Sequence, residues 1–137
     1  MPKSWQQKYV SAKPAHVVTL EKSFAGVPAG ARLLIPDPSL VERHVRAAKP
    51  GEPLDLAELR ARMAAEREAD ACCPVTTSIH LRIVAEIATE KLEAGMPADE
   101  VAPFWRVAAP EAPLAKKLSC GPDFIRRQRA REAPAKL

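Results

Sequence analysis

The chain has 137 residues, 47% of them apolar and 28% charged, which is the balance of a single soluble globular domain. No apolar run approaches the roughly 18 residues that a membrane span requires. The basic N-terminal stretch lacks the apolar core of a secretory signal, so we expect no membrane partner. Three cysteines, an odd number, predict no disulfide framework and favour a reduced, cytoplasmic protein.

The net charge of +4 is unevenly distributed along the chain. Residues 113–137 contain seven basic and two acidic side chains, so this segment carries +5 and the other 112 residues carry −1. A basic patch on a nearly neutral body indicates an anionic partner, such as nucleic acid or an acidic protein surface. A solvated helix face accounts for the same charges equally well.

The first 37 residues are expected to form a partly extended N-terminal arm. Residues 1–15 show no periodicity and are interpreted as a tail. The segments HVVTL (16–20) and ARLLI (31–35) are candidate short strands, and the AGVPAG between them has turn chemistry. The alternative is an irregular arm that lies over the core.

Two amphipathic helices are predicted next. The first, 38–48, has Asp37 as its N-cap, a proline at its first position and the sequence KPG after its end. The second, 56–68, follows Asp55, which together with Glu58 resembles a capping box.

The longest predicted helix covers residues 78–94. Thr76 or Thr77 is its expected cap, and Gly95 is expected to close it in a left-handed conformation. Apolar residues cover more than half of its circumference, so we expect it at the centre of the core. A final helix, 122–133, directs most of its arginines outward.

The segment APFWRV (102–107) contains two of the six aromatic residues of the chain, and we predict an extended strand over 101–107. The order of elements predicts an α-rich α+β fold. It would be a small winged-helix-like domain over 38–137, with a short sheet and a basic C-terminal helix, preceded by the irregular N-terminal arm (1–37). Compact packing of helices alone is the alternative.

The sequence contains little that indicates catalysis. Cys73, His80 and Cys120 could be metal ligands, but no C-x-x-C or H-x-x-x-H pair supports a zinc site, and buried structural cysteines are favoured. The helix start after Cys120 could lower the pKa of its thiol. Nucleotide loops and serine-nucleophile motifs are missing. We therefore expect no enzyme, no metal and no cofactor.

Three short segments nevertheless resemble a known family. GEPLDL (51–56) looks like a glycine-centred G-E-T-x-S-Y turn, RIVA (82–85) like an R-A-V-G recognition-helix motif, and PFWRV (103–107) like a P-C-H-R-V active-site strand. In this order they are similar to the DNA-binding domain of the O6-alkylguanine-DNA alkyltransferases and of their non-catalytic relatives, the alkyltransferase-like proteins. The resemblance covers about residues 38–133.

The departures from this family concern the reacting groups. The alkyl-accepting cysteine would fall at Phe104 and its activating histidine at Trp105, and neither side chain can act as nucleophile or base. Leu56 stands where the family has a tyrosine, whereas Arg82 matches the arginine that replaces an extruded base. The resemblance thus implies a non-catalytic DNA-binding protein, with alkylated guanine as a candidate ligand.

The expected partner is DNA, with RNA as an open alternative. Phe104 and Trp105 would stack on a flipped base, unless they only fill a core that is poor in aromatic residues. The alternative function is a protein-interaction module on the same fold, which uses the acidic strip of the central helix or the proline-rich arm. The expected nucleic-acid-binding residues are Arg82, Thr77, Ser78, Phe104, Trp105, Arg106, Lys116, Lys117, Arg126, Arg127 and Arg129.

Overall fold

The computed structural model describes residues 2–133, and its elements form an α-rich α+β domain, which confirms the predicted fold class. In chain order the elements are α1 (Trp5–Ser11), β1 (His16–Thr19), β2 (Arg32–Ile35), α2 (Pro38–Arg46), α3 (Leu56–Glu66), β3 (Ala71–Cys72), α4 (Pro74–Glu93), the 3-10 turns η1 (Ala98–Glu100) and η2 (Phe104–Arg106), α5 (Pro113–Lys117) and α6 (Gly121–Glu132).

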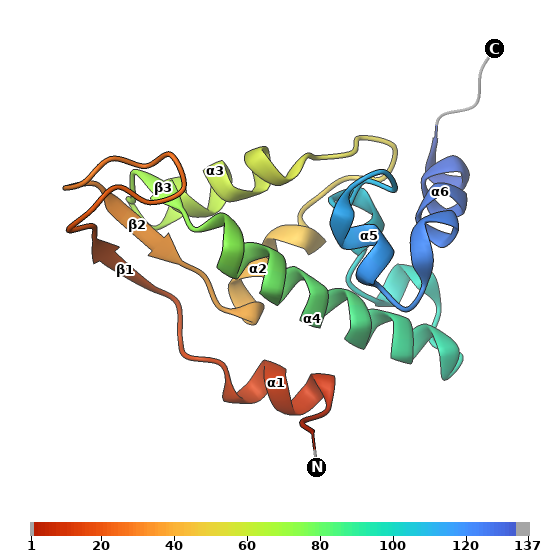
Figure 1. The fold of residues 1–137 in the computed structure, drawn as a ribbon. Helices are drawn as coiled ribbons and strands as arrows, with labels where there is room; N and C mark the ends of the chain where they lie inside the picture. The colour runs from red at the N-terminus through yellow and green to blue at the C-terminus, as the bar shows by residue number, and fades with distance from the viewer. Residues whose placement is uncertain (1, 134–137) are drawn as a thin grey trace.

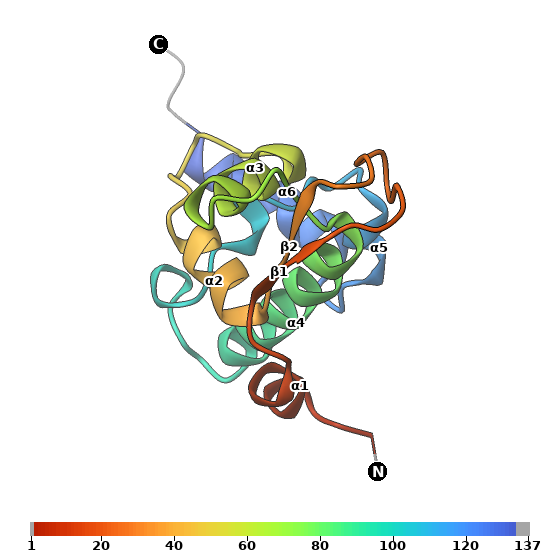
Figure 2. The ribbon, with the colours of Figure 1, turned by 90° about the vertical axis from the view of Figure 1, so that its left-hand side faces the viewer.

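Helix α4 is the central element of the fold (Figure 1). It packs against α1, α2 and η2, and Figures 1 and 2 both show α3 on one side of it and α1 on the other. Leu81, Val84 and Ala88 are at most 2% exposed, as its broad apolar surface predicts. The sheet lies near the N-terminal end of α4, and α6 lies toward its other end (Figure 1).

The two predicted strands are confirmed as β1 and β2, which pair antiparallel. The short β3 was not predicted, and it pairs in parallel with β2, which places Leu33 opposite Ala71. Strand β2 is therefore the middle strand of the sheet, and Leu33 and Leu34 are almost completely buried. The extended part of the arm is joined to the rest of the chain through this pairing.

The prediction that residues 1–15 form a tail without regular structure was wrong, because residues 5–11 form α1. Its start is stabilised by a capping box: the Ser4 hydroxyl accepts from the Gln7 amide at 3.1 Å, and the Gln7 side chain accepts from the Ser4 amide at 2.8 Å. Gln7 occupies the third helical position of this capping box, where glutamate is the more familiar residue. The helix buries none of its residues, so no apolar periodicity indicates it.

The predicted helices 38–48, 56–68 and 122–133 are confirmed as α2, α3 and α6 to within two residues at each end. Helix α4 begins four residues earlier than expected, because Pro74 suits the first turn and Cys73 is the N-cap, with its Sγ accepting from the Thr76 amide at 3.5 Å.

The closure of α4 is as predicted. Gly95 has φ +100, and the amides of Gly95 and Met96 donate to the carbonyls of Leu92 and Lys91, each at 3.0 Å, which is a Schellman motif.

The predicted strand over 101–107 was also wrong, since this segment contains the 3-10 turn η2. Pro103 has no amide hydrogen to donate to a neighbouring strand, and its carbonyl accepts from the Arg106 amide at 3.0 Å. The Ala108 amide in turn donates to the Phe104 carbonyl at 2.9 Å. Because these backbone groups are paired locally, they do not pair with a neighbouring strand. The buried segment packs as a compact turn against α4.

Candidate nucleic-acid interface

The N-terminal half of α4 presents one open face. Val75 and Ile79 are each 55% exposed, and Ser78 and Arg82 lie half-buried on the same side of the helix. The first turn contains no acidic residue. Thr77 points the other way: it is 1% exposed, and its hydroxyl donates to the Cys73 carbonyl at 2.7 Å, so it belongs to the helix start rather than to this surface.

A groove of about 240 Å³ lies along this face, between α1, α4 and α5. We call it the α1–α4–α5 groove. Ile83 and Leu114 are buried in its floor, and its lining includes three basic side chains and no acid among the described residues. The full lining is Trp5, Lys8, Ser78, Ile79, Arg82, Ile83, Leu114 and Lys117.

Arg82 lies against the indole of Trp5 in this groove. The carbon of its guanidinium is 5.3 Å from the ring centroid, and the Lys8 ammonium is 4.3 Å from the same centroid. The Arg82 Nε is buried, and within residues 2–133 it has no hydrogen-bond acceptor. The nearest carboxylate oxygen is Glu86 Oε2, at 3.9 Å from Nε. The guanidinium thus lies beside an aromatic ring and forms a long ion pair with Glu86.

Glu86 is buried behind Arg82 and does not line the groove. Its side chain is only 4% exposed, and it accepts hydrogen bonds from the amide of Ser119, at 3.3 Å, and from the hydroxyl of Ser119. The carboxylate therefore caps the turn between α5 and α6. The two other acids of α4, Glu90 and Glu93, lie in its C-terminal half, where both are exposed.

The two adjacent aromatic residues of the APFWRV segment are in the core. Phe104 is 0% and Trp105 1% exposed. Their ring centroids are 5.4 Å apart in an edge-to-face arrangement, and both rings pack on Phe124, at 6.1 and 6.2 Å. The interpretation that they fill the core is confirmed, and neither ring face is accessible for stacking on a base.

Two of the predicted DNA-contacting arginines form contacts within the protein. Arg106 pairs with Glu132 at 2.8 Å and donates to the Ala48 carbonyl at 2.9 Å. Arg129 donates through Nε to the Trp105 carbonyl at 2.6 Å. Both side chains therefore join η2 to α6.

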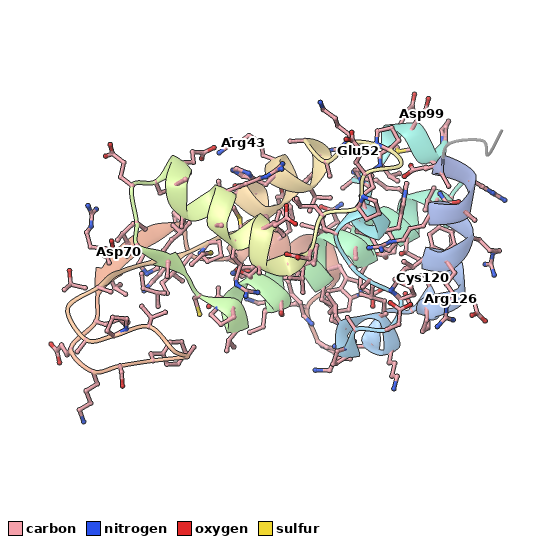
Figure 3. The ribbon with its side chains drawn as sticks, turned by 90° about the horizontal axis from the view of Figure 1, so that it is seen from above. Arg43, Glu52, Asp70, Asp99, Cys120 and Arg126 are labelled. Carbon is pink, nitrogen blue, oxygen red and sulfur yellow. The ribbon has the colours of Figure 1, made fainter. Side chains whose placement is uncertain are left out.

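The other predicted basic residues are on the surface. Lys116 and Lys117 end α5 and Arg127 is exposed on α6, but only Lys117 lines the groove. Arg126 pairs with Asp123 at 2.7 Å, and Figure 3 shows Arg126 and Cys120 at the same end of the molecule. The structure thus brings together Arg82, Ser78 and Lys117 from the predicted set.

Two of the three cysteines, Cys72 and Cys120, have raised pKa values. Burial, with a further contribution from the charge of Glu86, raises the pKa of Cys120, so the expectation that the helix start lowers it was wrong. Burial likewise raises the pKa of Cys72 and lowers that of His80. Within the described part of the chain, no three His, Cys, Asp or Glu side chains are grouped to hold a metal ion, and no helix is long and apolar enough to cross a membrane.

Sequence reasoning missed Trp5, Lys8 and Ile79 as parts of this surface. The capping box from Ser4 to Gln7 could have indicated α1, and Trp5 and Lys8 are then three residues apart on one helix face. The approach of α1 to α4 is a tertiary contact that no local pattern encodes.

No protein-family model matches the sequence, and no curated protein or solved structure matches it significantly. The similarity to the alkyltransferase-like proteins therefore stays a prediction based on the three short motifs.

Proposed function

We propose that the protein is a non-catalytic DNA-binding protein similar to the alkyltransferase-like proteins, and that it contacts DNA through the α1–α4–α5 groove. The observation that carries this proposal is the open, acid-free N-terminal half of α4, with Arg82 at the groove. A helix whose N-terminal residues are accessible can enter the major groove and reach base edges. Alkylated guanine is the candidate lesion that such a protein would detect.

The charges around α4 support binding of DNA at the N-terminal half of this helix. Lys8 on α1 and Lys117 on α5 stand on either side of the helix, where they can contact the phosphates of a bound duplex. Glu86 is buried beneath Ser119, and the exposed acids Glu90 and Glu93 lie in the distant half of the helix. Repulsion between this helix and the phosphates is therefore small at the end that would bind.

The chemistry of the chain supports binding without reaction. The position that matches the family nucleophile is Phe104, a hydrocarbon ring in the core. The thiol of Cys120 has a raised pKa, which disfavours the thiolate that alkyl transfer requires. The three cysteines are free thiols, which supports a cytoplasmic location for this activity.

The test is fluorescence anisotropy with a labelled duplex of two helical turns, which contains either guanine or O6-methylguanine, at low and near-physiological salt. The wild type is compared with Arg82→Ala and with the charge-matched control Arg62→Ala. Arg62 is exposed on α3, on the opposite side of α4 from α1. We expect salt-dependent binding that is tighter for the modified duplex and is weakened by Arg82→Ala only.

Equal losses in Arg82→Ala and Arg62→Ala would show that only net charge matters and would contradict the placement of the interface. Weak binding of both duplexes that vanishes near physiological salt would contradict the proposal itself. The same titration with an RNA duplex decides between the two nucleic acids.

One observation favours a protein partner instead. Val75 and Ile79, next to each other on α4, are each 55% exposed, and adjacent exposed apolar side chains are typical of surfaces that bind proteins. This alternative predicts negligible DNA binding at physiological salt, and a complex with a partner that is lost in Ile79→Asp.

A further inference from the structure

Helix α1 holds an aromatic side chain at the edge of the groove without contributing a buried residue to the core. The capping box at Ser4 stabilises the helix itself, and Tyr9 attaches it to the domain: its ring packs against the core, and its hydroxyl donates to Glu42 at 2.7 Å. Glu42 is itself paired with Arg46 at 2.9 Å, so this contact joins α1 to α2. The result is a half-buried indole of Trp5 that faces the N-terminal half of α4.

The groove around this indole has the chemistry of a site for a base with its phosphates. The Trp5 ring supplies an aromatic face, and Ile83 and Leu114 supply an apolar floor. Three cations, Lys8, Arg82 and Lys117, surround it with no acid among the described lining residues. Aromatic faces combined with basic side chains are the usual means by which proteins bind unpaired bases.

The size of the groove limits what it can hold. Its volume of about 240 Å³ lies below the ~300–1,000 Å³ of pockets for drug-sized ligands. One planar base fits this description better than a larger molecule. The Lys8 ammonium, 4.3 Å from the ring centroid, belongs to an exposed side chain that can move to a phosphate, because an exposed cation–aromatic contact is weaker than a base stack.

We propose that Trp5 is a base-stacking residue: one unpaired nucleobase of a DNA strand stacks on its indole in place of the Lys8 ammonium, while Lys8 and Lys117 contact the adjacent phosphates and Arg82 stays beside the ring. This inference rests on the DNA binding proposed above and adds its ligand preference. Trp5 thereby has the role that the sequence predicts for Phe104 and Trp105, whose rings are buried. The preferred ligand is a duplex with an unpaired base rather than a fully paired one.

The two tryptophans of the chain make the test direct, because Trp105 is 1% exposed and only Trp5 can report on a stacked base. The full chain is titrated with a paired duplex and with the same duplex carrying one bulged nucleotide, while anisotropy and tryptophan emission are recorded. We expect the bulged duplex to bind more tightly and to quench the emission at the same concentration at which it binds.

Three variants separate stacking from folding. Trp5→Ala should weaken binding of the bulged duplex by about 5- to 150-fold and change binding of the paired duplex little. Trp5→Phe, which keeps an aromatic face, should retain most of the affinity and lose the quenching. Val10→Ala, at a position 76% exposed on the same helix, is the control and should match the wild type.

The outcomes distinguish this inference from the proposed function. If the wild type binds DNA but Trp5→Ala binds the bulged duplex equally well, the DNA-binding function stands and the role of Trp5 is overturned. Equal losses for both duplexes, or equal losses in Trp5→Ala and Trp5→Phe, overturn it as well, because they indicate a structural contribution. If the wild type binds neither duplex, both proposals are overturned.

Discussion

Arg106 and Glu132 form a bidentate ion pair that connects the end of α6 to η2. Glu132 accepts from Arg106 Nη2 at 2.8 Å and from Nε at 3.0 Å, and Nη1 donates to the Ala48 carbonyl just after α2. Both side chains are 18% exposed. One arginine in the motif that resembles an active-site strand therefore connects three segments that are distant in sequence.

Loss of this arginine should lower stability and leave DNA binding unchanged. We expect Arg106→Ala to reduce the free energy of unfolding by about 1–3 kcal/mol, because Glu132 and the Ala48 carbonyl lose their partner in a partly buried site. Urea denaturation measures the change. Arg126→Ala is the control, since its exposed pair with Asp123 should contribute less than about 1 kcal/mol. A loss of DNA affinity at unchanged stability would contradict this assignment.

The aromatic cluster should behave as core. We expect Phe104→Ala to destabilise the protein by about 3–5 kcal/mol, because a fully buried ring is replaced by a cavity. Phe104→Leu, which fills more of the space, should cost clearly less. Thermal unfolding followed by circular dichroism measures both. Near-native stability in Phe104→Ala together with a loss of DNA binding would instead indicate a ring that is accessible to bases.

An ion pair between α2 and α3 should make stability depend on acid pH. The hydrogen-bonded guanidinium of Arg43, with Nη2 at 2.5 Å from Oε2, lowers the pKa of Glu66 from 4.5 to about 2. The folded protein therefore holds the charged form more strongly than the unfolded chain. The resulting stability is present above pH 4.5 and is lost as the pH falls from 4.5 toward 2.

The variant Glu66→Gln should reduce this dependence. We expect a loss of less than about 1 kcal/mol at neutral pH, because the pair is accessible to solvent, and a flatter stability profile between pH 4.5 and 2. Denaturation curves at several pH values measure it. Glu93→Gln, which removes one exposed charge elsewhere, controls for net charge. An unchanged profile in Glu66→Gln would assign the acid dependence to other carboxylates.

Thiol labelling should be slow at all three cysteines near neutral pH. Burial raises the pKa of Cys72 and Cys120, and Cys73 is buried as a helix cap, so little reactive thiolate is accessible. Cys120, which is half-buried, should react first, and Cys120→Ser should remove that phase. Rapid reaction of one cysteine in the wild type would support an enzyme that uses this thiol.

The helices could be predicted where local chemistry and packing agree. Asp37 and Asp55 accept from the amides of Leu40 and Glu58, both at 2.8 Å, as their positions before amphipathic segments suggest. The stretch 101–107 carried no such information, because a segment that is buried at every position except Arg106 lacks the periodicity that separates strand from turn. The two-residue β3 is likewise too short to give a pattern, and it exists through its pairing with β2.

The candidate site was predictable only in part, for a related reason. Arg82 and Ser78 follow from the position of the helix, whereas the burial of Phe104 and Trp105 depends on where α6 packs. Trp5 joins the groove through the contact of Tyr9 with Glu42, which spans 33 residues. Neither the spacing of residues nor the composition of the chain predicts contacts over such a separation.

The position of β2 determines where the folding unit of this protein can begin. Because β2 lies between β1 and β3, a polypeptide that started at residue 38 would lack the middle strand and the side chains of Leu33 and Leu34. The remaining β3 would have no partner to pair with, and the side of α3 that contacts β2 would be exposed to water. We therefore expect a fragment that starts at residue 38 to be less stable than one that also contains residues 16–35.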